Sequence, residues 1–391
     1  MDATTAAGPR SPALHPTAAP LRPALTELRL SAFGRHRGTV LPLAPVTLLG
    51  GPSGSGKSQA LAACGALARL GAGEELAEVF PDTGAAVPDR ALPDAQRRRG
   101  FRIGCTVDGP AGAVRLDLAV QAEPSLRIVG ERLTAGGQVL LSTALRDPGR
   151  RTVQAGWLTG GTVGVTRAPL PDDRLGTALL PLRVAGSTHG QRQVLAAAEQ
   201  TVVALRSVFP CDPEPDRMRA PVALGAGRLS PDCADLAGVL HRTRHECGTR
   251  YGLLVEAART ACAGDVRDVA ARALADGRLV AELVRGAGPA TALARLGSGE
   301  LRFLALALVL LTGPGVLAVD PAAEVLPAQQ ALTVLADGFD RCLDVRQTAE
   351  LLRLARLSCA HGQTRLVAAV AQPTAATARG LPGVAVVDLV P

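Results

Sequence analysis

The segment from Val46 to Gly73 constrains the fold of this chain most strongly. It begins with the apolar run VTLLG, continues through the glycine-rich turn GPSGSG, and ends in KSQALAACGALARLGAG. The first part has the length of a short buried strand. The last part has apolar residues at helical spacing and closes on Gly71 and Gly73. A strand, a tight turn and a helix therefore follow one another directly, which favours an α/β fold.

The turn and the start of the helix fit the pattern G-x-x-x-x-G-K-[ST] at every position, and this pattern forms a phosphate-binding loop when it joins a strand to a helix. Its glycines let successive backbone N–H groups point at phosphate oxygens, and the helix adds its positive N-terminus. The lysine reaches the β- and γ-phosphates, and the final hydroxyl can bind Mg²⁺. The predicted nucleotide-binding residues here are Gly51, Pro52, Ser53, Gly54, Ser55, Gly56, Lys57 and Ser58.

Lys57 is the only lysine in the chain, and every other basic residue is an arginine. The sequence has no Asn and contains Ile only at Ile103 and Ile128, a composition that we attribute to a GC-rich, actinobacterial genome. Under such a bias Arg replaces Lys wherever either residue serves. A lysine at this position indicates a need for a compact ammonium where a planar guanidinium does not fit.

The rest of the chain alternates strand and helix patterns at both ends. Strand patterns fall at 25–33, at several places within about 101–165, at 277–284 (GRLVAELV), at 315–320 (GVLAVD) and in TRLVAAVAQP, which we expect to be the final core strand. Helical patterns fall at 191–208, 235–263, 265–275, 328–336 and 348–361, and a helix also follows LGSGE. This order predicts an α/β domain that carries a β-rich and then helical insertion.

Four segments resemble the RecF/SMC-like branch of the ABC-type P-loop ATPases, whose members are also described as AAA-family predicted ATPases. They are the opening strands with the phosphate loop (LRLSAFGRHRGTVLPLAPVTLLGGPSGSGKS), CDPEPDRMRAPV with LSPDCADLAGVL, the signature-like LGSGELRFLALALVLL, and VLAVD, which is similar to a Walker B strand. The long separation of Lys57 from Ser298 is typical of this branch and not of transporter subunits.

The resemblance implies a divided ATPase head. We expect a tail at 1–24, the N-terminal part of the head with Walker A at 25–95, an insertion at 96–275, and the C-terminal part with the signature and Walker B at 276–391. Two chains of such families enclose ATP head to tail, which implies an ATP-dependent homodimer. The signature residues that would contact the nucleotide of the partner chain are Leu296, Gly297, Ser298, Gly299 and Glu300. By themselves these residues also fit an ordinary helix start capped by Ser298.

The resemblance fails at two catalytic positions. Asp320 is predicted to bind Mg²⁺ together with Ser58, but Pro321 follows it where the family has a catalytic Glu. Glu324 is then the nearest carboxylate, and Gln372 occupies the place of the switch His and cannot shuttle a proton. We therefore predict a slow ATPase with a degenerate catalytic site. A non-hydrolysing, nucleotide-gated switch or scaffold and a DNA-associated repair or defence ATPase remain as alternatives.

Charge and cysteine usage add little to this prediction. The net charge of +7 permits nucleic-acid contact but also fits solvated surface arginines. Eight scattered cysteines, no charged and apolar leader, and no apolar run of the roughly 20 residues that span a bilayer predict a cytoplasmic protein without membrane contact. His241, His245 and Cys247 could begin a zinc site, but a solvated helix face is the simpler interpretation.

Overall fold

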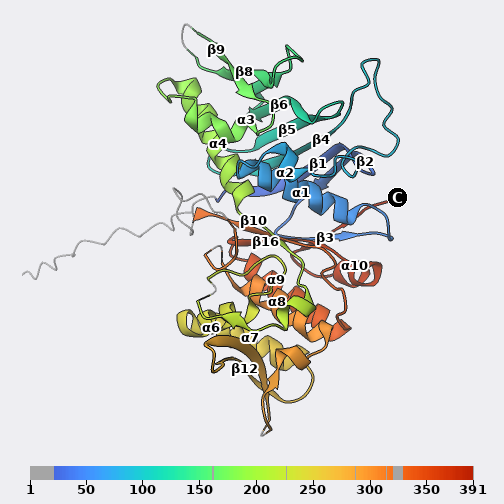
Figure 1. The fold of residues 1–391 in the computed structure, drawn as a ribbon, viewed down its shortest axis with the longest axis vertical. Coiled ribbons are helices and arrows are strands. Elements are labelled where there is room, and N and C mark those ends of the chain that lie inside the picture. The colour runs from blue at the N-terminus through green and yellow to red at the C-terminus, as the bar shows by residue number, and fades with distance from the viewer. Residues whose placement is uncertain are drawn as a thin grey trace, which may run out of the picture.

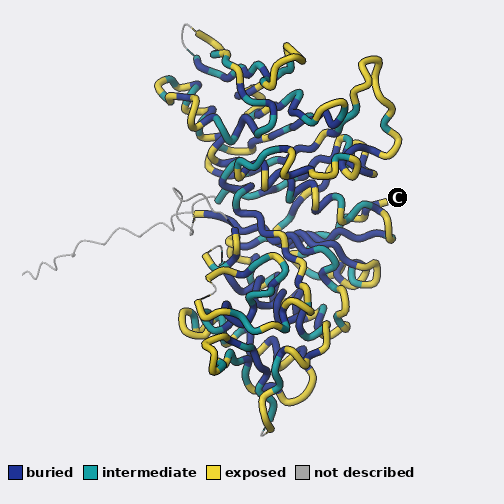
Figure 2. The backbone as a smooth tube through the Cα atoms, in the orientation of Figure 1, coloured by how far each residue is buried: buried dark blue, intermediate teal, exposed yellow. Residues whose placement is uncertain are grey.

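The computed structural model describes residues 22–160, 163–225, 227–286, 288–313, 315–319 and 329–390. Two lobes meet at a central parallel sheet, with the N-terminal lobe in blue to green and the other lobe in yellow to orange in Figure 1. Each lobe has its own buried core, and adjacent residues of one central strand, Leu48 and Leu49, contribute to different cores. The central sheet therefore separates the two cores, and buried backbone runs through the interior of both lobes (Figure 2).

The N-terminal lobe is built on an eight-stranded sheet in which all neighbours are antiparallel. Its strands, in spatial order, are β2 (His36–Pro42), β1 (Ala24–Phe33), β4 (Arg99–Asp108), β5 (Val114–Glu123), β6 (Arg127–Ala135), β7 (Gln138–Ala144), β8 (Thr152–Leu158) and β9 (Val165–Pro171). In β5 Leu116 and Leu118 are buried, whereas Arg115 is exposed, as expected for a sheet with one covered face. Helix α4 (His189–Arg206) covers that face, and its Gln200 donates to the Val107 oxygen at 2.9 Å.

The central sheet has five parallel strands. Their spatial order is β10 (Val208–Cys211), β15 (Leu332–Ala336), β16 (Thr364–Ala369), β3 (Val46–Gly50) and β17 (Val384–Asp388). Helix α1 (Lys57–Gly71) packs with the core of the N-terminal lobe, and helices α8 (Ser298–Leu311) and α9 (Val345–Cys359) belong to the opposite core. Because the strands are parallel, the loops that follow them all leave from one edge of the sheet.

The second lobe surrounds α8, whose residues are buried from Leu301 to Leu311, as expected for a helix that is apolar on all sides. Helices α6 (Leu236–Glu246) and α7 (Gly248–Ala261) and a small sheet complete this lobe. The small sheet contains β11 (Val222–Ala223), β12 (Val266–Ala273), β13 (Arg278–Arg285) and β14 (Thr291–Ala292). Short helical segments are α2 (Leu76–Val79), α3 (Gly176–Leu179), α5 (Pro215–Met218), α10 (Gln372–Ala378) and 3-10 turns at Leu180–Leu182 and Leu293–Arg295. No helix within the described ranges is long and apolar enough to cross a membrane.

Most of the predicted elements are confirmed, including the strand before the phosphate loop and the helix after it. The helix predicted over 265–275 is wrong, because this segment is strand β12 and pairs along its length with β13. The Asp276–Gly277 turn joins the two strands, and Gly277 has a φ of +78°. Cross-strand pairing here overrides the helical propensity of an alanine-rich segment.

Two further predictions fail in the stretch that leads into the central sheet. The strand predicted over 315–320 is absent from its described part, 315–319, where Leu317 makes only an isolated bridge to Leu229. The helix predicted over 328–336 is wrong, since Leu332–Ala336 form strand β15 between β10 and β16. TRLVAAVAQP does supply a core strand, β16, but β17 follows it at the far edge of the sheet.

Candidate nucleotide-binding site

The glycine-rich turn lies at the edge of the central sheet where β3 ends and α1 begins. Gly51, Gly54 and Gly56 have φ values of +136°, +79° and +93°, a region that residues with a Cβ rarely adopt. Gly56 is the N-cap of α1, and this helix has neither a side-chain cap nor an acidic residue in its first turn. The positive end of α1 is therefore available to an anion.

Two side chains in this turn have the properties expected of a phosphate cradle. The Lys57 ammonium donates to the Gly51 oxygen at 2.7 Å and to the Pro52 oxygen at 2.9 Å, so it lies over the turn. The Ser55 hydroxyl is buried and has no hydrogen-bond partner in the described part of the chain. Because buried polar groups are nearly always hydrogen-bonded, this orphaned hydroxyl fits a phosphate oxygen as its partner.

The turn between β1 and β2 braces this loop from outside. Arg35 donates to the Gly54 oxygen, and its backbone N–H donates to Gln59 Oε1 at 3.0 Å. His36 Nε2 lies 2.9 Å from the Gly56 oxygen and must carry the hydrogen, since a carbonyl oxygen only accepts. Sequence reasoning missed both residues, and the only signal for them is their place directly after the strand predicted at 25–33.

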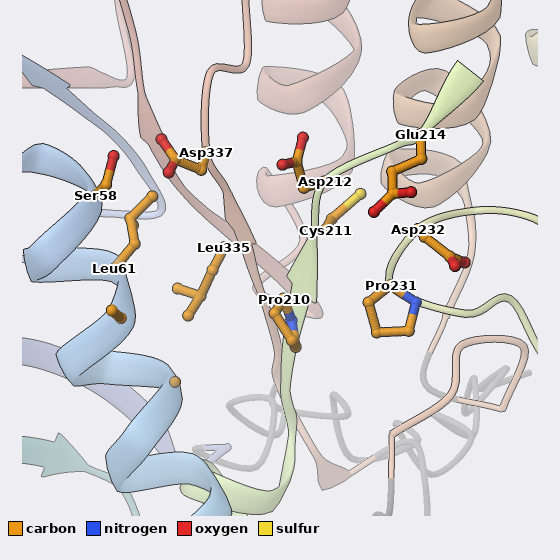
Figure 3. Close-up of a pocket in the computed structure, with 12 residues that line it drawn as sticks. Ser58, Leu61, Pro210, Cys211, Asp212, Glu214, Pro231, Asp232, Leu335 and Asp337 are labelled. Carbon is orange, nitrogen blue, oxygen red and sulfur yellow. The ribbon is translucent and has the colours of Figure 1, made fainter. Parts of the chain in front are cut away.

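The parallel sheet brings a second segment to the same edge. Asp337 directly follows β15, which is separated from β3 by β16 alone. Asp337 and Ser58 line one cavity of about 340 Å³ (Figure 3), and the Asp337 carboxylate points to the side on which Ser58 lies. Asp337 therefore has the position at the end of a core strand that the sequence reading gave to Asp320. Asp320, Pro321 and Glu324 lie outside the described residues.

The side chains that line this cavity could hold a magnesium ion only if nucleotide phosphates supplied further ligands. Among the described residues no group of three or more His, Cys, Asp or Glu side chains could hold a metal ion, and this includes His241, His245 and Cys247. Mg²⁺ commonly binds one or two protein ligands and completes its shell with phosphates and water. Ser58 and Asp337 match that requirement.

Strand β10 brings further carboxylates to the cavity. Asp212 and Glu214 follow the strand and line the cavity together with Asp232, on the far side of Asp337 from Ser58 (Figure 3). Burial alone would raise the pKa of Asp232, but hydrogen bonds from Ser230 and Ala234 and the charge of Arg217 together lower it. Asp232 therefore stays ionised as the ion-pair partner of Arg217, at 2.6 Å.

A buried arginine of α8 connects two of these strand ends. Arg302 is 3% exposed and donates to Asp212 Oδ1 at 3.0 Å and to the Pro213 oxygen at 2.5 Å. Its other terminal nitrogen donates to the Gly338 oxygen at 3.1 Å. The helix that begins at Ser298 is thus hydrogen-bonded to the loops after β10 and β15. An arginine inside the apolar run LRFLALALVLL was the signal available in the sequence.

The signature-like residues lie apart from this cavity. Gly297 and Ser298 are exposed at the start of α8, and Leu296 is buried, with its oxygen accepting from Arg219 at 2.9 Å. Gly299 packs so closely on the Cys342 oxygen that a Cβ there would overlap it. Glu300 pairs with Arg285 at 2.8 Å and accepts from the Ala263 N–H at 3.0 Å. None of residues 296–300 lines the cavity beside Ser58.

Gln372 is the first residue of α10 and is exposed at the edge where β16 ends. The α10 N-terminus is held by Asp340, whose carboxylate accepts from the Ala371 N–H at 3.0 Å and from the Thr374 hydroxyl. Gln372, Asp337 and the phosphate loop therefore follow three parallel strands that leave the sheet at one edge.

No protein-family model matches the sequence, and no curated protein matches it. Among solved structures, the chain is similar to an Smc head domain bound to the C-winged helix domain of ScpA, with 13% identity and a TM-score of 0.49 over 89% of this chain and 90% of that chain. It is also similar to an SMC head domain from Thermotoga maritima, with 14% identity and a TM-score of 0.43 over 92% and 93% of the two chains. An Smc head domain with an extended coiled coil, bound to the C-terminal domain of ScpA derived from Pyrococcus furiosus, gives 10% identity and a TM-score of 0.46 over 90% of each chain. Smc head domains are therefore structural neighbours of this chain.

Proposed function

We propose that this chain is a RecF/SMC-like ABC-type ATPase that binds Mg-ATP at the loop between β3 and α1. The observation that carries the proposal is the common edge of the parallel sheet, where Ser58, the last residue of the phosphate-loop pattern, and Asp337 line one cavity. Lys57 and the free N–H groups at the start of α1 would hold the phosphates. Ser58 and Asp337 would bind the Mg²⁺ ion of the complex. Bound Mg²⁺ neutralises charge that develops on the phosphate oxygens during transfer.

Equilibrium binding of ATP with and without Mg²⁺ tests this proposal. Lys57→Ala should weaken binding, because the ammonium that neutralises the phosphates is lost. Asp337→Asn should weaken binding by about tenfold or more only when Mg²⁺ is present, which corresponds to roughly 1.4 kcal/mol. Asp320→Asn is the matched control and should bind as the parent does. Magnesium-dependent loss in Asp320→Asn but not in Asp337→Asn would restore Asp320 as the metal-side residue.

We also propose that two chains enclose the nucleotide, with Ser298 and Gly299 of one chain facing the phosphates held by the other. The exposure of Gly297 and Ser298 and their absence from the lining of the cavity in the same chain support this arrangement. The molar mass measured by light scattering should double when a slowly hydrolysed ATP analogue and Mg²⁺ are added. Ser298→Arg should bind the analogue and remain a monomer. An unchanged mass for the parent at saturating analogue would refute the dimer.

Slow turnover is the third part of the proposal. Gly338 follows Asp337 and offers no side chain for water activation, and Gln372 cannot shuttle a proton. The same observations favour a nucleotide-gated switch as the alternative. Phosphate release by the parent, measured against Lys57→Ala, separates the two. Release that disappears in the variant indicates an ATPase, and equal background release from both proteins indicates a switch.

A further inference from the structure

The position directly after Asp337 in the loop that follows β15 supplies no carboxylate. Asp337 itself is the residue proposed above to bind Mg²⁺. Gly338 has a φ of +58°, and a Cβ there would lie 2.7 Å from Arg341 Nε. A glutamate at this position would be strained and would meet the arginine. If the site turns over ATP, the carboxylate that orients water does not come from the position directly after Asp337.

Strand β10 is the neighbouring element with carboxylates at the right edge. It runs parallel to β15 with Cys211 opposite Ala336, so the residues that follow, Asp212 and Asp337, leave the sheet side by side. Asp212 and Glu214 line the same cavity as Ser58. The register of the two strands therefore places Asp212 next to Asp337, and Glu214 lines the same cavity on the side of Asp337 away from Ser58.

Asp212 and Glu214 differ in the contacts that their carboxylates make with other side chains. Asp212 pairs with Arg302 at 3.0 Å and lies 3.6 Å from Arg341, so its charge is neutralised and its position is set by α8. No described residue forms a hydrogen bond or ion pair with the Glu214 carboxylate, which is directed back toward the cavity beside Cys211 (Figure 3).

The backbone of Glu214 is nevertheless held firmly. Its N–H donates to the Asp232 oxygen at 2.9 Å, and its oxygen accepts from the N–H groups of Arg217 and Met218. Pro213 and Pro215 flank it and fix the backbone φ on both sides. Glu214 is thus an exposed carboxylate that no described residue engages, on a held stretch of backbone in a cavity that Ser58 also lines, and it can accept a proton from water.

We propose that Glu214 is the water-activating residue of this site, an assignment that rests on the Mg-ATP binding proposed above. Glu214 accepts a proton from a water molecule as the water oxygen forms a bond to the γ-phosphorus. The bond from that phosphorus to the bridging oxygen breaks, ADP leaves with the electron pair, and the proton passes from Glu214 to the departing phosphate. No further reactant is needed.

The test compares Glu214→Gln with the parent in two assays on the full chain, equilibrium binding of Mg-ATP and phosphate release. The variant should bind ATP as tightly as the parent and release phosphate about 100-fold more slowly or less, since a general base contributes roughly 10²- to 10⁴-fold. Glu214→Asp should recover part of the turnover. Asp216→Asn is the matched control, because Asp216 is a neighbouring carboxylate that is 99% exposed at its side chain and does not line the cavity. It should match the parent in both assays.

The other variants identify competing residues. Glu324→Gln should retain turnover, and a loss there with normal turnover in Glu214→Gln would transfer the role to Glu324 and overturn the assignment. A loss confined to Asp212→Asn would overturn it in favour of Asp212. ATP binding without any turnover in the parent would overturn it in favour of a switch. Failure of the parent to bind Mg-ATP would instead remove the proposed function itself, so the two failures are distinguishable.

Discussion

Replacement of Arg302 by alanine is the sharpest structural test of how α8 is joined to the loops that follow β10 and β15. The guanidinium is buried in the second lobe and donates to the Asp212 carboxylate and to the oxygens of Pro213 and Gly338. One side chain therefore satisfies acceptors on two different strand-end loops. Its removal leaves these acceptors without their donor and opens a cavity beside them.

The magnitude follows from the exposure of each acceptor. The Asp212 side chain is 49% exposed, so losing its ion pair costs little, about 0–1 kcal/mol. The Pro213 oxygen is buried, and leaving such an acceptor unsatisfied costs about 1–3 kcal/mol. The Gly338 oxygen is partly buried and adds less. Relief of the desolvation of a buried arginine offsets part of the loss. We expect Arg302→Ala to lower the free energy of unfolding by about 2–4 kcal/mol.

Urea unfolding followed by circular dichroism measures this difference. Arg341→Ala is the matched control, because this arginine also approaches Asp212, at 3.6 Å, but its side chain is 52% exposed. It should change the unfolding free energy by less than about 0.5 kcal/mol. Arg302→Lys should fall between the two, since it keeps the charge and loses the planar fork. Stability of Arg302→Ala within about 0.5 kcal/mol of the parent would refute the reasoning.

Two further predictions concern the phosphate loop and a buried acid. Gly51→Ala should abolish ATP binding and lower the melting temperature, because the φ of Gly51 is +136° and a Cβ there would overlap the backbone. Gly65 lies on the open face of α1, so Gly65→Ala should raise the free energy of unfolding by about 0.5–1 kcal/mol. Calorimetry of the two variants decides this, and equal behaviour would contradict it. Burial raises the pKa of Glu131 above its ordinary 4.5, although hydrogen bonds from Thr177 and Gly176 oppose the shift. The native state therefore holds this proton more tightly than the unfolded chain does, and the free energy of unfolding should fall as the pH rises from 4.5 through the raised pKa. Glu131→Gln should lack this pH-dependent fall when unfolding is measured at a series of pH values. A parent-minus-variant difference that is flat or rises with pH would contradict the assignment.

Local sequence was enough to predict the phosphate loop. Its strand, turn and helix are adjacent in the chain, and the glycines are required by local backbone geometry that no distant contact can replace. The same holds for the start of α8 at Ser298 and for most of the antiparallel strands, whose turns lie within a few residues of each strand. These features depend on interactions of short range, which composition and spacing report directly.

The carboxylates that line the cavity with Ser58 could not be predicted from local sequence. Two apolar segments, 315–320 and 332–337, each end in an aspartate, and local pattern does not distinguish them. Pairing with β10 and β16 selects the second segment as the core strand, because a buried strand inside a sheet hydrogen-bonds its backbone groups to a neighbour on each side. The same pairing brings Glu214 to the edge, more than a hundred residues before Asp337 in the chain. Hydrogen bonds between segments so distant in sequence do not show in the local spacing of apolar and polar residues. Only the folded sheet therefore reveals which carboxylates share a cavity with Ser58.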